Sequence, residues 1–132
     1  RGAFEEGVVV KNGSGLFDAD RTTSSAMATL LRVSYLDPAI RPELVSHLAI
    51  AGVDGTLRGR LRAWAPRRAV RAKTGTLNAV ATLSGYVLAP PGRSAVAFSI
   101  LLNDVSGKAG PARIAIDQLV DAIAKEVWRD AP

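Results

Sequence analysis

The stretch VRAKTGTLNAVATLSGYVL, residues 70–88, decides the fold. Apolar and polar side chains alternate along it with a period of two, which is the pattern of β-strands. The pattern predicts strands at residues 70–75 and 79–88, and the turn Pro90-Pro91-Gly92-Arg93 joins the second to a third strand at residues 94–103 as a hairpin. Because the third strand is apolar at most positions, we expect an inner strand covered on both faces, with helices on at least one side.

The residues before this sheet are predicted to be mostly helical. After a short strand at residues 4–10, a helix is predicted to begin at about Thr23 and to end at Asp37-Pro38, since proline disfavours helical geometry in the residue before it. Two further short helices are expected at residues 42–49, where a proline suits the first helical position, and at residues 57–63.

A final helix is predicted from Pro111 to about Trp128, because apolar side chains recur there at helical spacing. Its expected apolar stripe consists of Ile116, Leu119, Ile123 and Val127. The order of elements predicts an α+β fold in which an antiparallel sheet is packed with helices and the last helix lies back across the sheet. No internal repeat or interdomain linker is present, so residues 1–132 are expected to belong to one domain.

The composition excludes several classes of protein. The chain is 48% hydrophobic and 22% charged, as in a folded domain, and its apolar runs are far shorter than the ~20 residues that a membrane-spanning helix needs. It has no cysteine and a single histidine, His47, which we expect to be a partly exposed helix residue. A thiolate site and a multi-histidine metal site are therefore excluded, and neither a metal nor a cofactor is expected.

The net charge of +5 comes largely from one basic run. It consists of Arg58, Arg60, Arg62, Arg67, Arg68, Arg71 and Lys73. Such a run can bind nucleic acid, but no recognition-helix or stacking motif accompanies it. We therefore interpret it as a solvated basic face and expect no nucleic-acid partner. Of the three functions that we consider for this chain, a nucleic-acid-binding module is the weakest hypothesis. A salt-dependent DNA titration would test it.

The residues that could carry chemistry are Lys73-Thr74-Gly75-Thr76, at the end of a predicted strand. A lysine beside a cleft attracts a carboxylate, and the hydroxyl of the following threonine can bind the same group. Gly75 lets another backbone approach the strand edge, which can pair with an extended peptide, and the N–H of Thr76 can point at a developing oxyanion. An ordinary strand ending in a turn would contain the same residues, so the motif alone does not decide between the two interpretations.

Several further motifs occur in a fixed order around this one. They are Gly13-Ser14-Gly15-Leu16, Ala51-Gly52-Val53-Asp54-Gly55-Thr56-Leu57, Val70-Arg71-Ala72-Lys73-Thr74-Gly75-Thr76-Leu77, Leu83-Ser84-Gly85-Tyr86-Val87 and Ala97-Phe98-Ser99-Ile100-Leu101-Leu102-Asn103. Together they closely resemble the C-terminal part of the S13 peptidases, the class C low-molecular-mass penicillin-binding proteins. The resemblance covers almost the whole chain, and several motifs in order are far more specific than one triplet.

The resemblance implies part of a serine β-lactamase/penicillin-binding-protein-like transpeptidase fold. It also implies a serine-type D-Ala-D-Ala carboxypeptidase or endopeptidase that acts on peptidoglycan stem peptides through an acyl-enzyme, binds β-lactams and works in the periplasm or elsewhere in the cell envelope. By position, Lys73 and Thr74 would hold the substrate carboxylate, and Thr76 would supply an oxyanion-hole N–H. Gly75 would admit the substrate backbone, and Asn78 would be either a rim residue of the substrate site or a turn residue.

Two of the three family motifs, Ser-x-x-Lys with its nucleophile and Ser-x-Asn, do not occur in these residues. In the family both precede the Gly-Ser-Gly-Leu segment, so we expect the chain to be the C-terminal part of the domain and to be inactive alone. Where the family usually has Ser-Arg near the cleft rim, this chain has Phe17-Asp18, a change that bears on stem-peptide preference. A non-catalytic peptidoglycan-binding or interaction protein with the same fold is the alternative, and intact upstream motifs would favour the enzyme.

Overall fold

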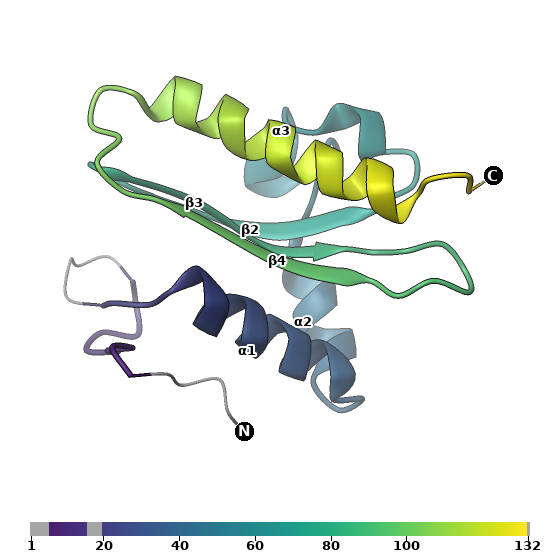
Figure 1. Ribbon diagram of the computed structural model, residues 1–132, viewed down its shortest axis with the longest axis horizontal. Helices are drawn as coiled ribbons and strands as arrows, with labels where there is room; N and C mark the ends of the chain where they lie inside the picture. The colour runs from purple at the N-terminus through teal and green to yellow at the C-terminus, as the bar shows by residue number, and fades with distance from the viewer. Residues whose placement is uncertain (1–5, 16–19, 132) are drawn as a thin grey trace.

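The computed structural model describes residues 6–15 and 20–131. In chain order its elements are α1 (Ser24–Leu36), α2 (Arg41–His47), β1 (Ala49–Ile50), η1 (Gly55–Leu57), η2 (Arg62–Trp64), β2 (Val70–Leu77), β3 (Val80–Val87), β4 (Val96–Leu102) and α3 (Ala109–Val127), where η marks a 3-10 turn. The strands form one antiparallel sheet in the order β1-β2-β3-β4, with α3 on one face and α1 and α2 on the other (Figure 1). None of these helices is long and apolar enough to cross a membrane. The predicted α+β fold is confirmed.

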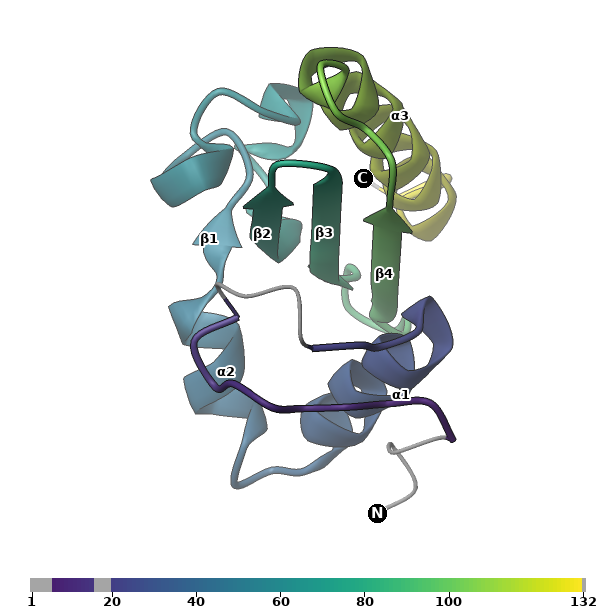
Figure 2. The same cartoon turned by 90° about the vertical axis from the view of Figure 1, so that its left-hand side faces the viewer.

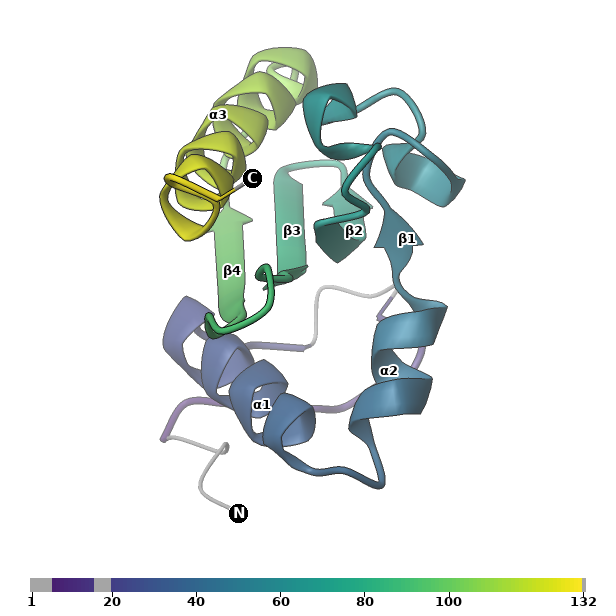
Figure 3. The same cartoon turned by 90° about the vertical axis from the view of Figure 1, so that its right-hand side faces the viewer.

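The core lies between the sheet and α3. β2 and β3 pair from Val70↔Val87 to Leu77↔Val80, and β4 continues the sheet beyond β3. The view along the sheet in Figure 3 shows α3 on one side of the strands and α1 with α2 on the other. The core side chains include Val70, Ala72, Ala81, Leu83, Val87 and Phe98 from the sheet and Ala112, Ile116, Val120 and Ala124 from α3. The opposite face of the sheet is therefore turned toward α1 and α2.

The buried stripe of α3 differs from the predicted one. Ile116 is 1% exposed, and Ile123 and Val127 pack partly buried against the core, as expected, but Leu119 is 54% exposed. The side chains buried together with Ile116 are Ala112, Val120 and Ala124, which follow one another at intervals of four residues. Because a helix has 3.6 residues per turn, side chains spaced either three or four residues apart can form its apolar stripe. The small alanines of the observed stripe let the helix backbone approach the sheet closely.

β4 is the last strand of the sheet that the described residues form, whereas the sequence predicts an inner strand. Within the described residues this strand pairs only with β3. Its apolar sequence has another cause, because α1 lies against one face of the strand and α3 against the other. The pattern correctly indicated two covered faces, but it carried no information about the number of paired edges.

The segment between β1 and β2 contains two 3-10 turns instead of the helix predicted at residues 57–63. Leu61 stands between η1 and η2 with a φ of 51°, a left-handed conformation that a continuous α-helix cannot contain. The helix predicted to reach residue 49 ends at His47, and Ala49 starts β1. In its described part, the strand predicted at residues 4–10 is reduced to one bridge between Val9 and Arg21.

Two side-chain contacts fasten this segment to α3. Nη2 of Arg60 lies 2.7 Å from Oδ1 of Asp117, and Nε1 of Trp64 donates a hydrogen bond to Oδ1 of Asp121 over 2.9 Å. Hydrogen bonds from Lys125 and then from Trp64 hold the pKa of Asp121 below its ordinary value. Arg60, predicted to lie on a solvated basic face, is thus largely buried in an ion pair between two elements.

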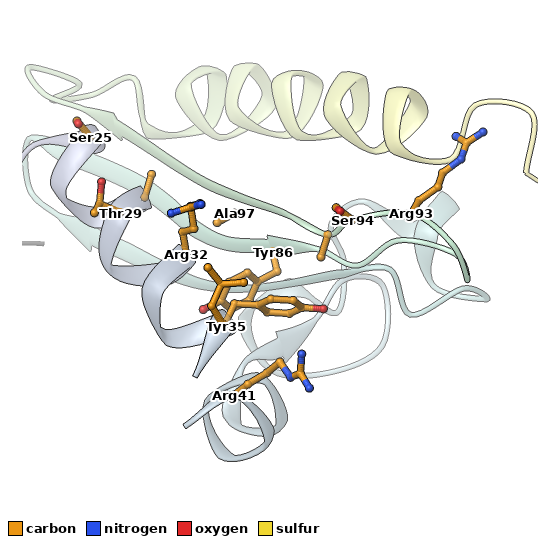
Figure 4. A pocket seen from close by; sticks show the side chains of 12 residues that line it. Ser25, Thr29, Arg32, Tyr35, Arg41, Tyr86, Arg93, Ser94 and Ala97 are labelled. Carbon is orange, nitrogen blue, oxygen red and sulfur yellow. The ribbon is translucent and has the colours of Figure 1, made fainter. Parts of the chain in front are cut away.

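Tyr86 is fully buried on the face of the sheet that α1 covers. Its hydroxyl donates a hydrogen bond to the carbonyl oxygen of Leu31 over 2.8 Å. Burial, together with the nearby Tyr35, raises the pKa of Tyr86 from 10.0 to about 12 (Figure 4). The folded state holds this proton more tightly than the unfolded state, so its contribution to stability is complete below pH ~10 and is lost as the pH rises toward ~12.

We expect the free energy of unfolding, measured by urea titration, to fall by roughly 2 kcal/mol between pH 10 and 12 through this residue. Tyr86→Phe should remove that part of the decline, because phenylalanine has no proton to lose. Tyr35→Phe is the matched control and should leave most of the decline in place. Equal slopes above pH 10 in the wild type and in Tyr86→Phe would show that the buried hydroxyl does not cause the loss.

Candidate active site

The Lys73-Thr74-Gly75-Thr76 motif lies within β2 and not at its end, since the strand continues to Leu77. On one side all four residues pair with β3. On the other side β1 pairs only with Ala72 and Arg71, so the edge of β2 from residue 73 onward has no partner strand among the described residues (Figure 2). An unpaired edge of this kind is the geometry that β-strand addition by a peptide requires.

The backbone groups at this edge can be assigned from the strand pairing. The N–H of Ala51 donates to the carbonyl oxygen of Val70, so the carbonyl of Val70 points toward β1. Residues along a strand direct their N–H and C=O groups to alternate sides, and residues two apart share a side. The N–H groups of Thr74 and Thr76 therefore point away from β3, in the plane of the sheet, along the unpaired edge of β2.

A cavity of about 850 Å³ lies against this edge, between the sheet and the helices α1 and α2. Most of its polar side chains come from the sheet, and most of its helix side is apolar. The sheet contributes Lys73, Thr74, Gly75, Thr76, Leu77, Val80, Thr82, Ser84 and Leu101, and the helices and the two residues that flank α2 contribute Met27, Leu30, Leu31, Ser34, Ile40, Leu44 and Leu48. The structure thus brings four of the five predicted site residues to one cavity.

Other predicted residues lie in different places. Asn78 is exposed in the turn between β2 and β3 and does not line this cavity, a position that favours its interpretation as a turn residue. Ser14 and Gly15, from the first motif of the family resemblance, do line it, although they are far from β2 in sequence. Phe17-Asp18, at which the chain departs from the family pattern, lies outside the described residues.

The side chains of Lys73 and Thr74 already have polar contacts. Nζ of Lys73 donates a hydrogen bond to the carbonyl oxygen of Thr74 over 2.7 Å, and no ion pair involves Lys73 in the described part of the chain. The hydroxyl of Thr74 lies 2.9 Å from the hydroxyl of Thr56. Among the described residues, no acidic side chain therefore neutralises the ammonium charge of Lys73. Sequence reasoning missed Thr56, because nothing local connects it to β2.

The structure gives a steric reason for glycine at position 75, in addition to the predicted functional reason. A Cβ atom at this position would overlap the hydroxyl oxygen of Thr82, its partner on β3, and would project toward the cavity. A nearby glycine, Gly85, is more restricted still, since a Cβ there would overlap the backbone of Arg71 and lie 2.6 Å from Cα of Ala72. Glycine at both positions allows β2 and β3 to pair at full length.

A second cavity, of about 690 Å³, lies between α1 and β4 (Figure 4). Basic and aromatic side chains line it, among them Arg32, Arg41 and Tyr35. The guanidinium of Arg41 stacks over the ring of Tyr35 at 5.4 Å, and that ring lies 5.1 Å from the ring of Tyr86. None of the predicted site residues lines this cavity, so the candidate site is confined to the cavity beside β2.

The sequence of the chain matches one family of peptidases. Residues 2–125 match the D-Ala-D-Ala carboxypeptidase 3 (S13) family, and the chain belongs to this family. The predicted resemblance to S13 peptidases is thereby confirmed.

Individual relatives agree with this assignment. The chain is 36% identical over 137 residues to a D-alanyl-D-alanine carboxypeptidase from an Actinomadura species, across 99% of this chain and 24% of that protein. It is 37% identical over 125 residues to carboxypeptidase DacB from Mycolicibacterium smegmatis, across 89% of this chain and 26% of that protein. The chain therefore spans about a quarter of the length of these curated relatives.

A solved structure shows the same fold. Penicillin binding protein 4 from Haemophilus influenzae is similar with a TM-score of 0.76 and 27% identity, over 93% of this chain and 29% of that one. A structure of the same Haemophilus protein complexed with a β-lactam gives a TM-score of 0.73 and 28% identity, over 92% and 29% of the two chains. The fold described here thus corresponds to part of a β-lactam-binding protein.

Proposed function

We propose that the full-length protein is a serine-type D-Ala-D-Ala carboxypeptidase or endopeptidase that acts on peptidoglycan stem peptides through an acyl-enzyme. Residues 1–132 form the C-terminal part of its penicillin-binding domain, and the enzyme works in the periplasm or elsewhere in the cell envelope, where peptidoglycan lies. The observation that carries this proposal is the unpaired edge of β2 beside a cavity of about 850 Å³, in a chain of the S13 family.

The geometry of β2 suits each step that the proposed reaction needs from it. The terminal carboxylate of the substrate binds the ammonium of Lys73 and the hydroxyl of Thr74, while the peptide backbone adds to the unpaired edge. A serine in the remaining part of the protein attacks the penultimate D-Ala carbonyl, and the outward N–H of Thr76 donates to the oxyanion that forms. The tetrahedral intermediate collapses and releases the terminal D-Ala, and water then hydrolyses the acyl-enzyme.

Labelling with a fluorescent penicillin tests this proposal. The full-length protein should acquire one covalent label that survives denaturation, because a β-lactam acylates the same serine. The 132-residue chain should acquire none, since it contains no Ser-x-x-Lys motif and catalysis requires an activated nucleophile.

Two results would contradict the proposal. A stoichiometric label on the 132-residue chain would place the nucleophile within it and refute the assignment of the chain to a nucleophile-free part of the domain. A full-length protein that binds stem peptides but is neither labelled nor active would be the non-catalytic peptidoglycan-binding protein instead.

A further inference from the structure

The hydroxyl of Thr56 lies 2.9 Å from the hydroxyl of Thr74, although the two residues belong to different elements. Thr74 lies in β2, and Thr56 lies in the turn η1, which the chain reaches before it enters β2. A hydroxyl carries one proton and can accept two hydrogen bonds, so either threonine can be the donor in this pair. Thr56 is exposed at the end of the unpaired edge and is not part of the core.

The backbone around Thr56 is held tightly. The buried side chain of Leu57 is 0% exposed, and its carbonyl oxygen accepts a hydrogen bond from the N–H of Gly52 over 2.9 Å. Oδ1 of Asp54 accepts a hydrogen bond from the N–H of Ile50 in β1 over 2.6 Å. These contacts fix the turn against β1, so the hydroxyl of Thr56 is presented to β2 from a defined position.

We propose that Thr56 is a positioning residue for the carboxylate of the substrate, an inference that rests on the proposed function. With the site empty, the hydroxyl of Thr74 donates to Thr56. When a carboxylate arrives, Thr74 turns its proton to the carboxylate and Thr56 donates its own proton to the oxygen of Thr74. The change reverses the hydrogen bond between the two hydroxyls by rotating their protons. No covalent bond breaks, and no heavy atom needs to move.

The physical reason for this role is the acceptor-only character of a carboxylate. Thr74 can bind it only by donating its single proton, and this leaves the oxygen of Thr74 as an acceptor that requires a donor. Thr56 supplies that donor, and a chain of two hydroxyls ending on an anion is strengthened by mutual polarisation. Without Thr56, the hydroxyl of Thr74 would be less well oriented toward the substrate.

The test compares variants of the full-length enzyme on two substrates with the same acyl group. One substrate ends in D-Ala-D-Ala, and the other is a thioester whose leaving group has no carboxylate. Thr56→Val should lower kcat/KM for the D-Ala-D-Ala peptide about tenfold, as expected for a hydrogen bond to a charged group, and should leave the thioester unchanged. Thr56→Ala should show the same split, and Thr56→Ser should restore the wild-type values.

The controls separate this inference from the proposed function. Thr29→Val, on α1 and outside the cavity beside β2, should change kcat/KM for neither substrate. Equal losses on both substrates, or no loss on either, in Thr56→Val and Thr56→Ala would refute the positioning role while leaving the enzyme assignment intact. A wild-type protein with intact upstream motifs that cleaves neither substrate would refute the proposed function itself.

Discussion

In the full-length protein, Lys73→Ala is expected to lower kcat/KM for peptides ending in D-Ala-D-Ala by about 100- to 1000-fold. Lys73 lines the cavity at the unpaired edge of β2, and no acidic side chain neutralises it in the described residues. Removing its ammonium group takes away the charge that binds the carboxylate and stabilises the transition state. The exposed side chain makes little contribution to packing, so the fold should be retained.

Steady-state kinetics on a D-Ala-D-Ala peptide, with thermal unfolding of the same samples, measures this effect. Lys108→Ala is the matched control, since Lys108 is an exposed lysine outside the cavity beside β2 and its removal changes the net charge equally. Kinetics of Lys73→Ala equal to those of the control would show that the Lys-Thr-Gly match is accidental.

The second large effect is expected at Gly75. Gly75→Val alone would be ambiguous, because the new side chain would overlap the hydroxyl of Thr82 and could lower stability for that reason. In a Thr82→Ala background the hydroxyl is absent, and the valine can project into the cavity beside Lys73. We expect the double variant to lose penicillin acylation on the order of 100-fold, since small displacements of a reacting group have effects of that size.

Thr82→Ala alone is the reference for this experiment and should keep both its melting temperature and most of its acylation rate. Penicillin acylation and thermal unfolding are measured on full-length protein for the wild type, the single variant and the double variant. Acylation of the double variant at the rate of Thr82→Ala would exclude the space next to Gly75 from the substrate site.

The long periodic elements could be predicted from the sequence, and the short ones could not. The helix predicted from Thr23 matches α1, and β2, β3 and β4 lie close to the predicted strands, because each repeats its pattern over several residues. β1 consists only of Ala49–Ile50, and such a short strand exists through its pairing with β2. The predicted helix is broken by the left-handed conformation of Leu61. The sequence did not predict this break, because the position holds a leucine and not a glycine or asparagine, the residues that usually adopt this conformation.

The candidate site also has a part that the sequence predicts and a part that it does not. Its residues in one stretch, Lys73 to Thr76, were found because they are consecutive and form a motif. The contact between Thr56 and Thr74 joins positions 18 residues apart through the fold of a turn, and no local pattern encodes it. The overlap of a side chain at position 75 with Thr82 likewise depends on the β2–β3 register, which the sequence predicted only as the presence of two neighbouring strands.

The contacts from Arg60 and Trp64 to α3 have a consequence for motion at the site. The turn that carries Thr56 is continuous with this segment, whose far end is joined to Asp117 and Asp121. We therefore expect local opening of this segment to disturb α3, which packs on the main core, so that the two open as one cooperative unit. Fluctuations at the edge of β2 are then limited by the stability of the core and not by the few contacts of a surface loop.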